Sequence, residues 1–334
     1  MIAIADKDPI DVSTLREAID DLDPSVADSV PSLSTVRDLA TQAKQGKFDQ
    51  ETVEATLDAI PELLRHERMS VHRIAAISGV VLADAGPETI DRLLARLLPM
   101  LEETVTERRT METIEYLSTV APDAVAEHDA VAMERLDHSR DGVARHAAGI
   151  LLAVGTEAPE RLVDAVPDLL AALTEDFESA TNKPLEVQGG DLMTLERHSR
   201  IEHESSRLIV GRTVAAATES HPEAVTDVVL DSGASELLIA LFEDQHPRVR
   251  AAATGVASHV AERDPTAFEP AIPRLIELLD DEKPVVRGNV IWTLAALDHP
   301  EAREGLRTAR ENDPSDELRE LAASVGPSNE SKPA

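Results

Sequence analysis

Apolar residues recur along this chain at helical spacing, in short runs separated by acidic residues and proline. The stretch LLDDEKPVVRGNVIWTLAALDHP, which starts at Leu278, begins with acids, turns at a proline and continues with apolar residues on one helical face. A similar stretch, LFEDQHPRVRAAATGVASHVAERDP, starts 37 residues upstream. This pattern predicts an all-α fold made of helix pairs that are joined by short acidic turns.

An arginine opens the second helix of each predicted pair, and a proline follows it 13 to 15 residues later. A second phrase places a proline near the start of an apolar run, where the proline fixes φ and either begins the first helix or bends it; it occurs as AIPELL, LLPMLE, AVPDLL and AIPRLIELL. One amphipathic helix pair cannot bury its apolar face without neighbours, so the repeat predicts a solenoid of stacked pairs. The arginines that open these helices are Arg73, Arg109, Arg145, Arg207, Arg250 and Arg287.

An acid lies six residues before four of these repeat arginines, and also before Arg319. We interpret these pairs as a structural ladder of charge-assisted contacts, either at the turn between two helices or between neighbouring repeats. Arginine suits such positions because its planar guanidinium tolerates partial burial better than the lysine ammonium does. The pairs are Glu67 with Arg73, Glu103 with Arg109, Asp244 with Arg250, Asp281 with Arg287, and Asp313 with Arg319.

The last complete unit, in which Pro273, Asp281 and Arg287 are separated by eight and then six residues, resembles the proline, aspartate and arginine pattern of HEAT repeats. The resemblance covers roughly residues 50–325 and is clearest at both ends of that range. It blurs over residues 123–137, which lack the proline. Similarity to this armadillo-like family implies antiparallel helix pairs stacked into a right-handed α-α superhelix of about seven helical hairpins.

Breaks in the repeat predict the domain organisation. Residues 1–50 are expected to form an N-terminal helical cap, with helices near Asp11–Leu22 and Ser32–Lys44. Residues 51–325 form the HEAT-repeat solenoid, interrupted at 176–200 by a polar insertion that contains Gly189 and Gly190 and that predicts a long loop. Residues 326–334 are expected to be a disordered tail.

Charge is the most unusual feature of the composition. The 64 acids and 32 bases give a formal net charge of −32, and only six of the bases are lysines. This resembles proteins adapted to molar intracellular salt, as in halophilic archaea, where a Debye length of about 3 Å screens self-repulsion. An ordinary acidic cytosolic protein is the alternative. The absence of cysteine excludes disulfides and thiolate metal sites, and the lack of a leader-like N-terminus or long apolar stretch predicts a cytoplasmic protein without membrane insertion.

Few residues of the chain suggest a catalytic, metal-binding or nucleic-acid-binding site. Some HEAT-like proteins are metal-dependent hydroxylases built on His-Glu pairs, but only His66-Glu67 and His203-Glu204 occur here, too few for that metal centre. We therefore predict no enzymatic activity, no cofactor and no metal. The best basic cluster is interrupted by acids and the chain has few aromatic residues for base stacking, so nucleic-acid binding is disfavoured. That cluster consists of Arg197, Arg200, Arg207 and Arg212.

The sequence thus predicts a non-enzymatic scaffold or adaptor that binds another protein through its concave surface. The second helices that begin near Arg109, Arg145, Arg207 and Arg250 are expected to line this surface. Arg197, Arg200, Arg207 and Arg212 are the candidate partner-binding residues. The alternative is a HEAT-like nucleic-acid-binding protein, or a lyase- or hydroxylase-type enzyme or its accessory protein.

Overall fold

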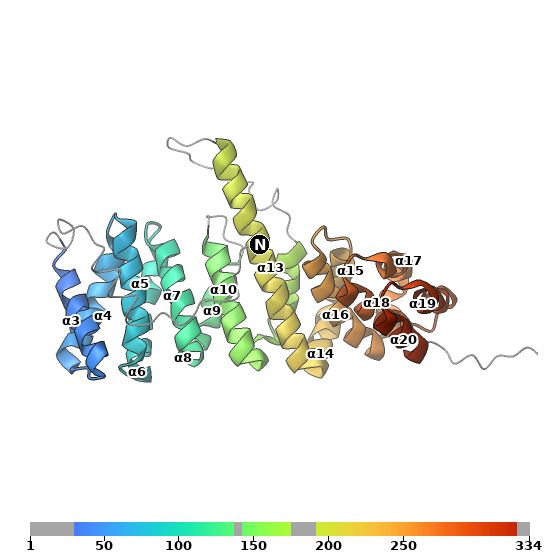
Figure 1. The fold of residues 1–334 in the computed structure, drawn as a ribbon, viewed down its shortest axis with the longest axis horizontal. Coiled ribbons are helices and arrows are strands. Elements are labelled where there is room, and N and C mark those ends of the chain that lie inside the picture. Colours follow the sequence, from blue (N-terminus) through green and yellow to red (C-terminus); the bar gives the residue numbers. More distant parts are fainter. Residues whose placement is uncertain (1–29, 137–141, 175–191, 326–334) are drawn as a thin grey trace, which may run out of the picture. The chain divides into compact units, whose positions relative to one another are not determined.

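The computed structural model describes residues 30–136, 142–174 and 192–325, with the backbone alone for residues 192–199 (Figure 1). Every regular element in these ranges is an α-helix or a short 3-10 helix, which confirms the predicted all-α fold. The chain divides into two compact units, residues 1–157 with 187–206 and residues 158–186 with 207–334.

The first unit stacks pairs of antiparallel helices. Its second helices, α5 (Met69–Ala83), α7 (Glu107–Val120) and α10 (Val143–Glu157), pack against one another in succession. The remaining elements are α3 (Ser32–Gln45), α4 (Gln50–Arg65), α6 (Pro87–Leu97), η1 (Leu98–Glu102), α8 (Pro122–Ala126), α9 (Asp129–Met133) and the first part of α13 (Leu192–Ser220).

The second unit repeats this arrangement. Its second helices are the later part of α13, then α16 (Pro247–Arg263), α18 (Pro284–Ala296) and α20 (Asp316–Val325). The other elements are η2 (Pro159–Leu162), α11 (Val166–Thr174), α14 (Pro222–Ser232), α15 (Ser235–Leu241), η3 (Pro265–Ala271), α17 (Ile272–Glu277), η4 (Leu278–Asp280) and α19 (Pro300–Asn312).

Proline sets where the first helices begin. A proline at the first helical position costs no hydrogen bond, because the amide N–H that it lacks would have no partner there, and its ring fixes φ. Each proline that follows a repeat arginine by 13 to 15 residues starts the next first helix or its 3-10 segment. These starting residues are Pro87, Pro122, Pro159, Pro222, Pro265 and Pro300.

Small aliphatic side chains fill the core between the helix layers. The only aromatic pair that the structure describes joins Phe242 to Phe268, whose ring centroids lie 6.2 Å apart; both side chains are fully buried. Alanine and glycine on the second helices let neighbouring helices approach closely. The packing therefore depends on shape rather than on large aromatic side chains.

The structure changes one expectation about the insertion. Leu192–Arg200, which the sequence predicts to be loop, belong to α13. The stretch LMTLERHSR contains no glycine or proline and is rich in good helix formers, so helix α13 extends through it. The expected helix near Ser32–Lys44 is present as α3. The expected helix at Asp11–Leu22, residues 176–191 of the insertion and the tail at 326–334 lie outside the described residues.

Candidate interaction surface

In the second unit, Arg250 and Arg287 each hold two successive turns together. Arg250 on α16 donates through Nη1 to the backbone oxygen of Asp244 at 2.8 Å and through Nε to the carboxylate of Asp281 at 2.7 Å. The other oxygen of Asp281 accepts from the backbone N–H of Lys283 at 2.8 Å. The arginine thus binds a carbonyl at its own turn and a carboxylate from the next repeat.

Arg287 repeats this geometry in the most buried ion pair of the ladder. Its Nη1 donates to the backbone oxygen of Asp281 at 2.8 Å, and Nε and Nη2 donate to the two carboxylate oxygens of Asp313 at 2.8 and 3.1 Å. Arg287 is 5% exposed and Asp313 is 6% exposed. Arg319 in turn donates to the backbone oxygen of Asp313. The expected ion pair between Asp281 and Arg287 is therefore a carbonyl contact, and the carboxylate partner comes from the next repeat.

The hydrogen bonds keep this buried pair charged. Burial alone would raise the pKa of the Asp313 carboxyl, but the hydrogen bonds from Arg287 and from the backbone N–H of Ser315 outweigh burial and lower it. The hydrogen bond to Asp313 raises the pKa of Arg287, although burial opposes that change. Both groups are therefore ionised over the neutral pH range.

Arg207 belongs to this ladder and is not free to bind a partner. It donates to the backbone oxygen of Leu173, with Nε at 3.1 Å, and its Nη2 forms an ion pair with the Asp244 carboxylate. Of the other predicted partner-binding arginines, Arg200 is exposed but already interacts with another residue. The side chain of Arg197 lies outside the described ones. Arg212 is exposed and forms no hydrogen bond or ion pair with the described residues.

At the turn before α5 in the first unit, His66 and His72 make contacts like those of the ladder aspartates and arginines. Glu67 and Arg73 are both exposed and form no ion pair within the described part of the chain, so the predicted pair is absent there. Instead, Nε2–H of His72, one residue before Arg73, donates to the backbone oxygen of His66. Nδ1 of His66 accepts from the backbone N–H of Arg68 at 3.1 Å, as Asp281 does from Lys283. Burial lowers the pKa of His72.

Glu103 and Arg109 are also not partners. Nη1 of Arg109 donates to the backbone oxygens of Leu64 at 2.9 Å and His66 at 3.0 Å, which belong to the preceding turn. The Glu103 carboxylate instead pairs with Arg65, with Nη2 to Oε1 at 2.5 Å, and the hydrogen bond from Arg65 lowers the pKa of Glu103. The six-residue spacing therefore predicts polar contacts at these turns but assigns the wrong partners.

A buried polar cluster joins α7, α10 and α13 within the first unit. Nδ1 of His146, which is 2% exposed, lies 2.6 Å from Oε2 of Glu115. Arg145 lies between Glu115 and Glu202, at 3.3 Å from each carboxylate. A Cβ at Gly149 would stand 2.3 Å from Oε1 of Glu115, so glycine is what admits that carboxylate. The polar groups of this cluster are used in contacts within the fold.

One exposed helix face in the second unit differs from the rest of this acidic chain. Trp292, the only tryptophan, is 44% exposed in the middle of α18. One turn earlier on the same side, Asn289 donates through Nδ2 to the backbone oxygen of Ala251 on α16 at 3.2 Å. Gly255 is so close that a Cβ there would lie 3.4 Å from the same Nδ2. We call this surface the Trp292 face; it comprises Ala251, Gly255, Asn289 and Trp292.

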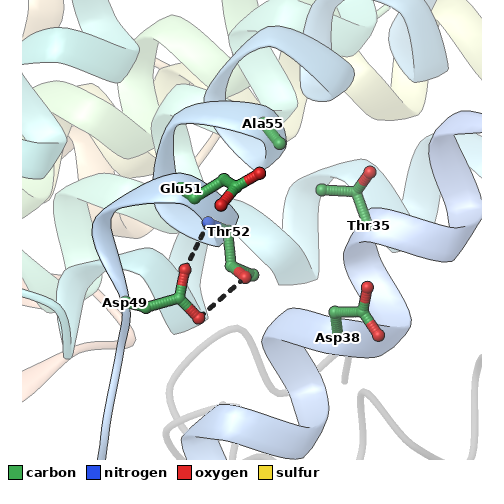
Figure 2. Close-up of a pocket in the computed structure, with 6 residues that line it drawn as sticks. All are labelled: Thr35, Asp38, Asp49, Glu51, Thr52 and Ala55. Carbon is green, nitrogen blue, oxygen red and sulfur yellow. Dashed lines mark hydrogen bonds between the residues drawn. The ribbon is translucent and has the colours of Figure 1, made fainter.

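A hollow between α3 and α4 has a different character (Figure 2). Asp49 caps α4, because its Oδ1 accepts from the backbone N–H of Thr52 at 2.8 Å and its Oδ2 from the hydroxyl of that residue at 3.0 Å. The backbone hydrogen bond lowers the pKa of Asp49. Among the described residues, no group of three histidine or carboxylate side chains is placed to hold a metal ion. The hollow is lined by Thr35, Asp38, Asp49, Glu51, Thr52 and Ala55.

Comparison with known proteins agrees with this architecture. Residues 234–325 match the family model of HEAT repeats. A computationally designed armadillo repeat protein for modular peptide recognition is similar with a TM-score of 0.51 and 15% identity, covering 70% of this chain and 98% of that one. An engineered protein from the Northeast Structural Genomics Consortium gives a TM-score of 0.45 and 17% identity, covering 94% and 87%. No curated protein matches the chain.

The fold is therefore an α-helical repeat fold of the HEAT and armadillo type, as predicted. None of the described helices combines the length and the apolar character that a membrane-spanning segment needs.

Sequence reasoning missed the Trp292 face because it selected surface residues by their positive charge. Trp292 lies on the helix opened by Arg287, which is not among the four helices expected to line the binding surface. A usable signal was present in the sequence. Val286, Val290 and Leu294 form the buried stripe of α18, which leaves the only tryptophan on the opposite side.

Proposed function

We propose that this protein is a non-enzymatic scaffold that binds an extended segment of another protein across the Trp292 face. One observation carries the proposal. In a chain with 64 acids and 2% aromatic residues, the only tryptophan is left 44% exposed on a face formed largely by small uncharged side chains. Exposed tryptophan is costly to leave in water and is enriched among the residues that dominate binding energy at protein interfaces.

The surroundings of Trp292 suit a bound peptide chain. Ala251 and Gly255 on the neighbouring helix have little or no side chain, so the backbone of a bound peptide can come close to the surface beside the indole. The hydrogen bond from Asn289 to Ala251 holds the two helices together under this surface at 3.2 Å. A surface held in place before binding loses little conformational entropy when a segment docks.

The similar fold of a designed armadillo repeat protein for modular peptide recognition supports this proposal by analogy. The polar clusters elsewhere in the described chain are explained by the fold itself. The ladder joins repeats, Glu115 and His146 join helices, and Asp49 caps α4. Binding of another protein is the function that the remaining exposed feature supports best.

A capture experiment with matched variants tests the proposal. The tagged chain is used to retrieve partners from the native host, with Trp292→Ala and Met69→Ala as variants. Met69 is 83% exposed in the first unit and so serves as an apolar control. The proposal predicts that a partner retained by the wild type and by Met69→Ala is lost with Trp292→Ala. Retention by Trp292→Ala, with helicity unchanged, would show that the Trp292 face is not the binding surface.

A further inference from the structure

We infer that the segment bound on the Trp292 face carries a carboxylate that pairs with Arg212, about five residues from an apolar side chain that packs on Trp292. This inference rests on the proposed function and adds the chemistry of the partner. Arg212 lies on α13, beside the Trp292 face. Its side chain is exposed and has no hydrogen bond or ion-pair partner among the described residues.

Acidic residues are missing from three second helices of the second unit. Asp and Glu make up 64 of the 334 residues, yet none occurs in residues 207–218 of α13, 247–261 of α16 or 284–296 of α18. Second helices do not lack acids in general, because both α7 and α20 carry them. The side chains that are exposed within the three acid-free ranges are all apolar or basic. They are Arg212, Arg248, His259, Pro284, Val285 and Trp292.

The ladder places Arg212 at the same level as Gly255 and Trp292. Each ladder arginine of these helices binds a carbonyl near the end of the first helix of its own repeat and a carboxylate from the next repeat. The three second helices therefore share a common height and rotation. Five positions after the ladder arginines stand Arg212, Gly255 and Trp292, so these residues face the same side.

Direct contacts show that α16 lies between α13 and α18. A Cβ at Gly211, next to Arg212, would lie 3.7 Å from Cβ of Ala252 on α16. On the other side of α16, Asn289 of α18 donates to the backbone oxygen of Ala251 at 3.2 Å. A chain that crosses α16 at the level of Gly255 can therefore reach Arg212 at one end and Trp292 at the other.

A carboxylate is the anion that suits Arg212. The planar guanidinium binds a carboxylate or a phosphate through two parallel hydrogen bonds, but a net charge of −32 opposes a phosphate dianion more strongly than a carboxylate. The nearest acids on α13, Glu204 and Glu219, are eight and seven residues away from Arg212. Seven residues span about 10 Å of helix, so physiological salt screens much of their repulsion.

Helix spacing sets the distance between the two groups of the segment. Packed helix axes lie about 8–10 Å apart, so α13 and α18, on either side of α16, are about 16–20 Å apart. An extended chain advances about 3.3 Å per residue, so this distance corresponds to about five residues. The acid of the segment therefore lies about five residues from the apolar side chain that contacts Trp292.

Synthetic peptides that lack tryptophan and tyrosine test the inference on the full chain. Each peptide has a leucine and, five residues away, a glutamate, a glutamine or a lysine. One series places this residue before the leucine and the other places it after, because a chain can cross the helices in either direction. Binding is followed by the fluorescence of Trp292, the only tryptophan of the protein.

Arg212→Glu is the test variant, and Arg310→Glu is a control with the same change in net charge. Arg310 is exposed on α19 and has no ion pair among the described residues. Both variants increase the long-range repulsion of an acidic peptide to a similar extent, so only a contact at Arg212 separates them. Circular dichroism verifies that both variants keep the helicity of the wild type.

In one of the two series, the ratio of the Kd values for the glutamate and lysine peptides should change about tenfold more in Arg212→Glu than in Arg310→Glu. Charge reversal replaces an attraction by a repulsion at an exposed ion pair. The glutamine peptide, which has no charge to pair, should bind both variants as it binds the wild type.

An equal change of this ratio in the two variants, in both series, would overturn the inference. A lack of response of Trp292 to every peptide would overturn it as well, because the apolar side chain of the segment is placed on the indole. The proposed function fails separately, if Trp292→Ala still captures the native partner.

Discussion

At the scale of single residues, the ladder is most sensitive to substitution at its buried ion pairs. Arg287 and Asp313 are nearly inaccessible to solvent and are linked by hydrogen bonds of 2.8 and 3.1 Å. A buried pair of this kind adds little net stability compared with an apolar pair. Removing one partner is costly, because the other charge is left buried without compensation.

We therefore expect Arg287→Ala to lower the free energy of unfolding of the second unit by about 3 kcal/mol, since it strands the Asp313 carboxylate. Chemical denaturation followed by circular dichroism measures the change. Arg307→Ala is the matched control, because Arg307 pairs with Glu304 and Glu311 on the exposed side of α19. Similar small effects for both variants would show that the Arg287 pair is not buried in solution.

His72 provides a pH-dependent counterpart in the first unit. Burial lowers the pKa of His72 in the folded protein, whereas the unfolded chain has the ordinary value of about 6.5. As the pH falls through about 6.5, the unfolded state takes up the proton first, so stability is lost until the pH reaches the lower folded pKa. His72→Gln retains an N–H donor for the His66 carbonyl but cannot titrate.

The variant should therefore lose less stability than the wild type between about pH 7.5 and pH 5.5, where carboxylates contribute little. Denaturation midpoints at the two pH values provide the comparison. An identical loss of stability in both proteins would contradict a role for His72 in the pH dependence.

Whether the sequence predicts a ladder contact depends on whether the group that accepts the hydrogen bond is a side-chain carboxylate or a backbone carbonyl. The recurring six-residue spacing locates the turns that carry polar contacts, and Asp244, Asp281 and Asp313 all take part. It fails to identify partners, because a backbone carbonyl exists at every position and carries no sequence signal. The role of His66 and His72 was not predicted for a related reason: their ladder-like contacts can be recognised only once the geometry of the turn is known.

At the scale of helices, close approach between neighbours depends on residues that have no side chain at the contact. Gly149 on α10 faces the Glu115 carboxylate, whereas Gly211 on α13 faces only Cβ of Ala252, at an ordinary contact distance of 3.7 Å from a Cβ built on it. Both glycines lie in second helices. Alanine is favoured over glycine within a helix by about 1 kcal/mol.

The two glycines should consequently respond in opposite ways to the same substitution. Gly211→Ala should raise stability by up to about 1 kcal/mol, because the added methyl group fits the available space. Gly149→Ala should lower stability, since the methyl group displaces Glu115 from His146 and Arg145. Thermal unfolding of the two variants decides the matter, and a stabilising Gly149→Ala would mean that Glu115 can move without loss.

Helix boundaries were predictable where proline marks them and were not where it does not. The sequence predicts a turn at Pro87, Pro222 and Pro300, and the first helices α6, α14 and α19 begin at these prolines. Pro61, in contrast, lies inside α4 and does not mark its start. The beginning of α13 at Leu192 was missed, because polar residues were taken to indicate a loop, although LERHSRIEHE is compatible with a helix. Polarity alone does not distinguish a solvated helix from a loop.

At the scale of the whole molecule, net charge is the property that most affects how stability depends on salt. A formal charge of −32 favours unfolding by self-repulsion at low ionic strength, and added salt screens that repulsion. The composition also fits adaptation to molar salt, which remains a prediction. The fold itself follows from the repeat period, but the Trp292 face does not, because it arises only when residues of α16 and α18 are brought together.

We expect the melting temperature to rise between about 0.1 M and about 2 M KCl. Scanning calorimetry at several salt concentrations measures this dependence. A flat or falling melting temperature would contradict the interpretation of the acidic surface as an adaptation to high salt.

The most direct measurement of the binding role uses Trp292 itself. Because the chain has one tryptophan, labelling it with fluorotryptophan gives a single fluorine NMR resonance that is independent of any tryptophan in the partner. Addition of the purified partner should shift this resonance and reduce its sensitivity to solvent, since the indole moves from partial exposure into an interface. If the partner binds the chain and the resonance keeps both its position and its solvent sensitivity, the Trp292 face is not where this protein binds.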